Sequence, residues 1–312
     1  MNTKTIGVAG AGLMGLGITQ AMAMGGHPVL VYDVSETALR SATETIQRNL
    51  VGASRLGVLQ ESDISDVASR IRTTSSLSEF AGDADLVVEA VPENLDLKRR
   101  FFTELEHIAG DDTIITSNTS SLLPDDIAGV LDRPERFLVT HFFNPPYLIP
   151  LVEVVPGQRT DPEVVGEAVS LIEKIGNTPV VLNKAVPGFL INRLQIALLR
   201  EALSLVQNGV ASVDDVDKAV RSSIGRRLSI AGVFEVCDLA GLDVVKAAAE
   251  TVLGDLNCTQ ELSELIRGHV DRGELGAKTG RGFYQWDEES IQMKRSRIAA
   301  ALAAIRSFHR QA

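Results

Sequence analysis

The chain has 312 residues, of which 45% are hydrophobic and only 4% aromatic, and its formal net charge is −11. This length allows one large domain or two medium ones, with a core built mainly from aliphatic side chains. The acidic balance argues against nucleic acid or an anionic membrane as a partner, because phosphate groups bind to basic surfaces.

Neither export nor membrane insertion is predicted. The two cysteines, Cys237 and Cys258, form no disulfide framework and no CxxC pair, which favours a reducing, cytoplasmic environment. The apolar start is similar to a signal peptide, but five glycines within the first 17 residues would break the helix of such a peptide. No uninterrupted apolar run of 18 residues occurs, so we expect no membrane-spanning helix.

The first part of the chain alternates between strand and helix patterns. It predicts a strand at residues 6–9, a glycine-rich turn, a helix ending near Met24 and a second strand at 28–32. Further strands are predicted at residues 71–74, 86–90, 113–116, 137–141, 151–155 and 179–182, and helices at 36–59, 95–108 and 163–175, the first of them interrupted near 52–57. This alternation favours an open, mostly parallel α/β sheet.

After Lys184 the pattern becomes helical. Helices are predicted at residues 189–206, 217–222, 242–253, 260–272 and 290–310, and one further strand at 280–286. Ser212 and Asp215 have the spacing of a capping box before the second of these helices. We therefore expect an α/β domain at residues 1–185 and an all-α domain at 186–312.

The sequence GAGLMG at residues 10–15 is a GxGxxG turn between the first predicted strand and helix. The first glycine permits a tight turn, the second allows a pyrophosphate to approach, and the third allows close packing of helix on strand. An acid that ends the second strand suits the adenosine ribose and would repel a 2′-phosphate, which favours NAD over NADP. The pattern predicts a Rossmann-type domain whose cofactor contacts are Gly10, Gly12, Leu13, Met14, Gly15 and Asp33.

Polar residues follow three of the predicted strands, in the stretches 88–98, 117–121 and 141–144. Ligands of open α/β sheets bind outside the carboxyl ends of the strands, so we expect these clusters to share one crevice with the glycine turn. Each cluster also has a structural explanation, because Ser, Thr and Asn often form turns, and a single His near Pro is more often structural than catalytic.

Together these clusters suit a dehydrogenase. Oxidation of a secondary alcohol requires a base for the hydroxyl proton, and imidazole, the side chain of His141, suits that role. The carboxylate of Glu153, in the next apolar run, could fix the tautomer of that ring and stabilise its charged form. A Ser hydroxyl and an Asn amide could hold the substrate oxygen. No metal-ligand cluster is visible.

The ordered motifs VEAVPENLDLK, SNTSSL, HFFNPP, LVEVV, PGFLINR and GAKTGRGFY resemble those of the 3-hydroxyacyl-CoA dehydrogenase family over about residues 4–286. This resemblance implies oxidation of a 3-hydroxyl group by NAD, a place in fatty acid metabolism, and a homodimer formed through the helical domain. It implies that His141 is the base, Glu153 its partner, and Ser120 and Asn192 contacts of the substrate oxygen. It also places Glu93, Lys98, Asn118 and Asn144 at the nicotinamide half of the cofactor.

Two stretches depart from the members that act on CoA thioesters. Those members carry a lysine-rich stretch that meets the CoA phosphates, whereas residues 48–60 here contain no lysine and are followed by Glu61, Asp63 and Asp66. The segment 225–235 is longer and contains arginines, as in relatives that oxidise gulonate, carnitine or pyridine carboxylates. Arg227 is therefore a candidate anchor for a substrate carboxylate, although a surface ion pair explains it equally well.

Three hypotheses follow for the function. The first is an NAD-dependent 3-hydroxyacyl-type dehydrogenase, whose substrate is a CoA thioester or, alternatively, a small free alcohol bearing a carboxylate. The second is a non-catalytic NAD-binding protein, which would have no need for the set Ser120, His141, Glu153 and Asn192. The third is a lyase or isomerase, for which the sequence offers no second acid/base domain.

Overall fold

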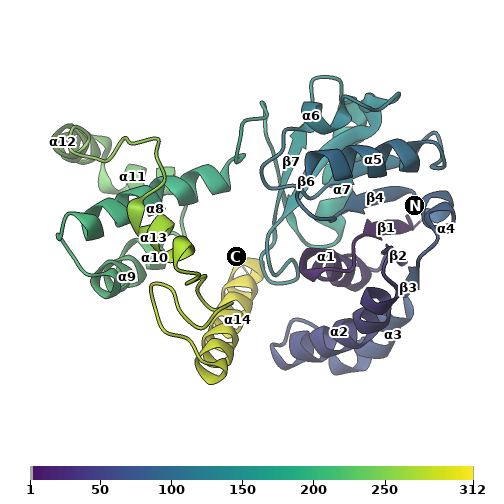
Figure 1. Ribbon diagram of the computed structural model, residues 1–312, viewed down its shortest axis with the longest axis horizontal. Coiled ribbons are helices and arrows are strands. Elements are labelled where there is room, and N and C mark those ends of the chain that lie inside the picture. Colours follow the sequence, from purple (N-terminus) through teal and green to yellow (C-terminus); the bar gives the residue numbers. More distant parts are fainter. Residues whose placement is uncertain (1–2, 312) are drawn as a thin grey trace. The chain divides into compact units, whose positions relative to one another are not determined.

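The structure of the protein, a computed structural model, describes residues 3–311. The chain packs into two compact units (Figure 1). The first comprises Met1–Asn192 together with Ala299–Ala312, and the second comprises Arg193–Ile298.

An eight-stranded sheet in the order β3-β2-β1-β4-β5-β6-β7-β8 forms the centre of the first unit. All neighbouring strands are parallel except β6 and β7, which are antiparallel. The strands are β1 (Ile6–Ala9), β2 (Val29–Tyr32), β3 (Ile71–Thr74), β4 (Leu86–Glu89), β5 (Ile114–Ser117), β6 (Phe137–Phe142), β7 (Leu151–Pro156) and β8 (Thr178–Val181). The predicted α/β class and its mostly parallel sheet are confirmed.

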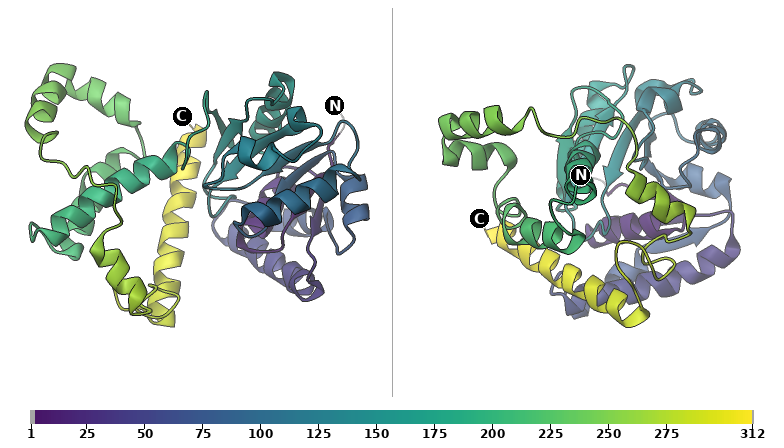
Figure 2. Two further views of the ribbon diagram at one scale, coloured as in Figure 1. Left: turned by 45° about the horizontal axis from the view of Figure 1, so that its top comes forward. Right: turned by 60° about the vertical axis from the view of Figure 1, so that its left-hand side comes forward.

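Helices cover both faces of this sheet (Figure 2). One face packs against α1 (Leu13–Met24), α2 (Glu36–Arg55), α3 (Ile64–Ser69) and α7 (Pro162–Lys174). The other packs against α4 (Leu77–Asp83), α5 (Leu95–Glu106) and α6 (Pro124–Ala128), and the short 3-10 helices are η1 (Glu61–Asp63) and η2 (Pro134–Arg136). Strands β1, β4, β5 and β6 are buried along their whole length, as expected for strands covered on both sides.

The second unit is helical. It contains α8 (Ile191–Gln207) apart from its first two residues, α9 (Val213–Ser222), α10 (Ile224–Arg227), α11 (Val233–Ala240), α12 (Leu242–Val252), α13 (Glu264–Asp271) and the first half of α14 (Glu288–Gln311). Ser212 accepts a hydrogen bond from the Asp215 N–H, so α9 begins at Val213 rather than at the predicted residue 217. The prediction of a strand at 280–286 is wrong, since Arg281 forms only isolated bridges there. Helix α11 was not predicted.

The second unit buries few apolar side chains by itself. Among its described residues, Leu203 is the single hydrophobic side chain that is buried, while Phe234 and Leu239 are each 84% exposed. A hollow of about 290 Å³ between α8, α9 and the 283–286 segment is lined mainly by apolar residues. None of the helices in residues 3–311 is long and apolar enough to cross a membrane.

The division between the units differs from the predicted boundary after residue 185. The chain stays with the first unit as far as Asn192, because the N–H groups of Leu190 and Ile191 donate to Glu153 and the Asn192 amide donates to Ser120. The end of α14 also packs with the first unit, where Arg306 donates to two backbone carbonyls.

Candidate active site

The glycine turn follows β1 and opens α1. Gly10 has a φ of +109°, and a Cβ there would lie 2.7 Å from the Ala90 carbonyl oxygen. A Cβ on Gly15 would lie 1.8 Å from the Gly10 oxygen, so neither position tolerates a side chain. A Cβ on Gly12 would meet no atom within 4 Å, which leaves that side of the turn open to a ligand.

The first turn of α1 suits an anion. Gly12 caps the helix without a side-chain hydrogen bond, and the first turn contains no acidic residue that would repel a phosphate. Backbone N–H groups at Leu13 and Met14 are thus presented at the positive end of the helix. The order of the sheet reverses between β1 and β4, where such folds bind their ligands. These residues fit the pyrophosphate of a dinucleotide.

Asp33 is tied to the same turn. It follows β2, and its Oδ2 accepts a hydrogen bond from the Ala11 N–H at 2.8 Å while its Oδ1 accepts one from the Ser35 N–H at 2.9 Å. These bonds fix the carboxylate beside the glycine loop. An acid in this place is arranged to accept hydrogen bonds from ribose hydroxyls.

His141 and Glu153 form a buried pair across the antiparallel strands β6 and β7. The two residues are directly opposite in the strand register, and the Nδ1 of His141 lies 2.7 Å from the Oε2 of Glu153. Glu153 is 0% exposed, and its Oε1 accepts hydrogen bonds from the N–H groups of Leu190 at 2.9 Å and Ile191 at 2.8 Å. The structure thus brings these two side chains into direct contact.

The hydrogen bonds decide the charge of Glu153. Burial raises the pKa of this carboxyl, but the hydrogen bond from His141 and those from the backbone at Ile191 and Leu190 outweigh burial, and the pKa lies below its ordinary value of 4.5. An ionised Glu153 keeps the ring proton on Nδ1, so that Nε2 carries the lone pair of a base. The rings of Phe143 and Phe189 lie 4.4 and 5.8 Å from the imidazole, between centroids.

A second buried ion pair lies at the end of β4. The Nζ of Lys98, which is 1% exposed, is 2.6 Å from the Oε1 of Glu89 and 3.4 Å from the Oε2 of Glu93. Glu89 also accepts a hydrogen bond from the Ser117 hydroxyl at 2.6 Å. Burial raises the pKa of Glu89, and Lys98 and Ser117 only partly offset this effect.

The sequence did not single out Glu89 as a site residue, because an acid after the apolar residues of the stretch VVEA is typical of a strand end. Its neighbour Glu93 was predicted. Burial raises the pKa of Glu93, but hydrogen bonds from the Thr119 and Ser121 hydroxyls, the charge of Lys98 and the Ser120 N–H bring it below its ordinary value. Glu93 thereby holds the loop after β5 against the end of β4.

Four of the remaining predicted residues lie in the first unit. The Oδ1 of Asn118 accepts a hydrogen bond from the Phe142 N–H at 2.8 Å, one residue after His141. The Nδ2 of Asn192 donates to the Ser120 carbonyl oxygen at 3.2 Å, which brings the Asn192 side chain to the backbone of Ser120. Asn144 is exposed in the loop between β6 and β7. Arg227 ends α10 in the second unit and is exposed.

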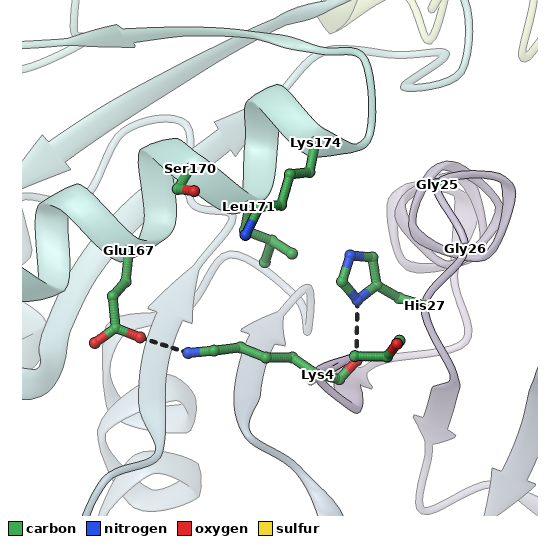
Figure 3. A pocket seen from close by; sticks show the side chains of 9 residues that line it. Lys4, Gly25, Gly26, His27, Glu167, Ser170, Leu171 and Lys174 are labelled. Carbon is green, nitrogen blue, oxygen red and sulfur yellow. Dashed lines mark hydrogen bonds and ion pairs between the residues drawn. The ribbon is translucent and has the colours of Figure 1, made fainter. Parts of the chain in front are cut away.

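A second group of polar side chains lies at the amino ends of the strands, opposite the glycine turn. A hollow of about 320 Å³ lies there, next to residues that precede β1 and β2 (Figure 3). Lys4 pairs with Glu167 at 2.5 Å, and the Nδ1 of His27 donates to the Lys4 carbonyl oxygen at 3.0 Å. Because these groups sit at the amino ends of the strands, they are separated by the sheet from the glycine turn. Residues 3–311 contain no group of three or more His, Cys, Asp or Glu that could hold a metal ion.

Comparison with known proteins gives two family matches. Residues 5–186 match the NAD binding domain of 3-hydroxyacyl-CoA dehydrogenase, and residues 188–286 match the C-terminal domain of the same family. The chain is 36% identical over 291 residues to a probable 3-hydroxybutyryl-CoA dehydrogenase of Bacillus subtilis, covering 93% of this chain and 100% of the relative. It is 33% identical over 303 residues to the 5-formyl-3-hydroxy-2-methylpyridine 4-carboxylate 5-dehydrogenase of Mesorhizobium japonicum, covering 97% of each.

Solved structures give the same two groups. A crystal structure of 5-formyl-3-hydroxy-2-methylpyridine 4-carboxylic acid 5-dehydrogenase, described as an NAD⁺-dependent dismutase, matches with a TM-score of 0.91 and 32% identity over 98% of each chain. The (S)-3-hydroxybutyryl-CoA dehydrogenase of Ralstonia eutropha matches with a TM-score of 0.76 and 32% identity, covering 92% of this chain and 100% of its own.

Proposed function

The chain belongs to the 3-hydroxyacyl-CoA dehydrogenase family and is an NAD-dependent oxidoreductase that acts on CH–OH groups, and we propose that its substrate is a small alcohol with a free carboxylate. One observation carries this choice of substrate. The fold matches the pyridine-carboxylate dehydrogenase with a TM-score of 0.91 over 98% of each chain, whereas three hydroxyacyl-CoA dehydrogenase structures, one of which covers 96% of this chain, match with TM-scores of 0.70–0.76.

The surface of α2 and η1 supports the same choice. Between residues 48 and 60 only Arg48 and Arg55 are basic, and Arg48 already donates to the Thr45 hydroxyl at 2.9 Å. The acids Glu61 and Asp63 that follow are exposed. Several CoA phosphates would meet few donors and a repulsive field on this surface.

We propose that His141 removes the hydroxyl proton at its Nε2 as the C–H bond of the substrate breaks. Glu153, held ionised by His141 and by two backbone N–H groups, then stabilises the imidazolium. Ser120 and Asn192 hold the substrate oxygen as it becomes a carbonyl. NAD, when bound, accepts the hydride.

The cofactor contacts form a second part of the proposal. Asp33 accepts hydrogen bonds from the adenosine ribose, and the turn from Gly10 to Gly15 receives the pyrophosphate. The residues Glu93, Lys98, Asn118 and Asn144 line the nicotinamide half. The buried Lys98 is held by Glu89 and Glu93, so its charge is fixed in position before the cofactor arrives.

A hydroxyacyl-CoA thioester is the second candidate substrate. It is favoured by the 36% identity to the probable 3-hydroxybutyryl-CoA dehydrogenase. NADH formation by the purified protein on a panel of free hydroxy acids, pyridine carboxylate alcohols and 3-hydroxyacyl-CoA thioesters separates the two. We expect turnover of at least one free acid and none of the thioesters. Turnover restricted to thioesters contradicts the proposal, and NAD binding without any turnover would favour the non-catalytic alternative.

We also propose that the protein is a homodimer formed through its second unit. A unit that buries only Leu203 among its described hydrophobic side chains, and exposes Phe234 and Leu239, leaves a large apolar surface in water. A second copy of the same surface would cover it, as closed two-fold interfaces do. Light scattering of the purified protein gives the mass directly, and a monomer at micromolar concentration would contradict this assembly.

A further inference from the structure

The end of α14, the yellow helix in Figure 1, belongs to the first unit. The family match ends at residue 286, before this helix begins. Beyond the matched range the chain thus continues into a helix whose last part, residues 299–311, packs with the α/β unit. This arrangement raises the question of what the helix holds there.

Arg306 makes the hydrogen bonds that join the tail of α14 to two loops. Its Nη1 donates to the carbonyl oxygen of Tyr147, in the loop between β6 and β7, and its Nη2 donates to the carbonyl oxygen of Gly176 at 3.2 Å, in the turn between α7 and β8. A guanidinium is suited to such a bridge, because its donors form a rigid planar fork.

Packing does little to replace these bonds. A hollow of about 480 Å³ separates much of the tail from the same loops, and it is lined by Leu148, Ile149, Leu302 and Ile305 among others. Ala303 is the buried hydrophobic residue of the described tail. The two charge-assisted hydrogen bonds of Arg306 therefore directly connect the tail to both loops.

The tethered loop connects the two halves of the proposed site. It runs from residue 143 to 150, between the strand of His141 and the strand of Glu153. Its first half packs on α1, where a Cβ on Gly17 would lie 2.7 Å from the Cδ of Pro146. The N–H groups of Leu148 and Ile149 both donate to the Pro145 carbonyl oxygen at 2.9 Å. In the chain, Asn144 therefore lies between His141, the proposed base, and the turn at residues 145–149, which packs on α1.

We propose that Arg306 is a positioning residue, which fixes the 143–150 loop and through it Asn144 against the nicotinamide half of the cofactor. The inference rests on the proposed role of Asn144 in that half of the site. Arg306 acts through the backbone of Tyr147 and touches neither substrate nor cofactor.

The test compares Arg306→Ala, Arg306→Lys and Arg297→Ala. Arg297 lies on the exposed face of the same helix, so its variant controls for the loss of one charge. Hydrogen exchange of the Leu148 and Ile149 amides reports the loop, and calorimetric titration with NAD reports the site. Both readouts are independent of the substrate, so a wrong substrate assignment leaves this test intact.

We expect Arg306→Ala to speed exchange of these two amides about tenfold and to weaken NAD binding about three- to tenfold, since a loosened loop no longer presents its contact. Arg306→Lys should recover part of both effects, because a lysine donates to one carbonyl but cannot form the fork. Removal of residues 299–312 should reproduce Arg306→Ala. Unchanged exchange, or faster exchange with wild-type NAD affinity, overturns the proposal, as would an equal effect of Arg297→Ala.

Discussion

The β6–β7 pair and the helical second unit are opposite kinds of structure. In the first unit, Glu153 is 0% exposed, its carboxylate accepts three hydrogen bonds, and two strands set its distance to His141. In the second unit, most large apolar side chains remain at least partly exposed. The residues of the proposed chemistry are held inside one unit by backbone geometry, whereas the described part of the other unit buries little apolar surface, which is the ground for the proposed dimer.

This contrast separates two kinds of mutational effect. A change at His141 or Glu153 alters a rigid, desolvated pair and should act on the chemical step. A change on the surface of the second unit should act on assembly or on substrate capture and leave cofactor binding intact.

The largest effect is expected for His141→Ala. Removing the base should lower kcat by about 10²–10⁴-fold while NAD affinity stays near wild type, because the glycine turn and Asp33 are untouched. Steady-state kinetics and an NAD titration measure the two quantities. The exposed His107→Ala serves as the matched control and should behave as wild type. A wild-type rate in His141→Ala would remove the base from the mechanism.

Arg227→Ala tests the second unit's contribution to substrate capture. If the guanidinium holds a substrate carboxylate, KM for that acid should rise about 10- to 100-fold with little change in kcat, since two charged hydrogen bonds are lost. The neighbouring Arg226→Ala is the control for the loss of charge. An unchanged KM would assign Arg227 to the protein surface rather than to the substrate.

Glu153→Gln probes the stability of the buried pair and its pH dependence. The pKa of Glu153 is lowered in the folded state, so its stabilisation is present above its ordinary value of 4.5 and is lost as the pH falls through the folded-state pKa. Near neutral pH the variant should be less stable by about 1–3 kcal/mol, because His141 loses a charged partner.

Urea unfolding at about pH 7 and at about pH 4 measures this difference. The gap between wild type and Glu153→Gln should narrow at the lower pH. Glu44→Gln, on the exposed face of α2, should show no such narrowing. A gap that stays constant or widens towards acid would contradict the direction of the pKa shift.

The smallest effect on cofactor chemistry is expected for the double variant Phe234→Ser, Leu239→Ser. Both side chains are 84% exposed, so little packing is lost within one chain. The variant should shift the mass from dimer towards monomer while NAD affinity changes by less than about twofold. Light scattering with a parallel NAD titration checks both. A dimer that survives this change would place the interface elsewhere.

The parts of the molecule that local sequence rules determine were predictable. The motif GxGxxG together with Asp33 predicted the position of the turn, because glycines are required there for steric reasons. In the structure, a Cβ on Gly10 or Gly15 would clash with backbone atoms. The His141–Glu153 pair followed from the motifs of the family, and the antiparallel register then placed the two residues directly opposite each other. Polar residues at strand ends were the signal for Asn118 and Glu93.

The parts that depend on tertiary contacts were not predictable. Glu89 reads as the end of an apolar strand, and only its distance to Lys98 reveals the buried pair. The return of residues 299–311 to the first unit involves hydrogen bonds from Arg306 to backbone carbonyls far away in the sequence. The segment 280–286 has apolar and glycine residues that are typical of a strand, but it finds no partner strand.

The central claim is that a family built for hydroxyacyl-CoA oxidation here serves a free acid. The most direct measurement compares kcat/KM for a matched pair, a 3-hydroxy acid and the CoA thioester of the same acid, at saturating NAD. Both present the same hydroxyl to His141, so the ratio isolates the recognition of CoA. The account predicts that the free acid has the higher kcat/KM, and a strong preference for the thioester would contradict it.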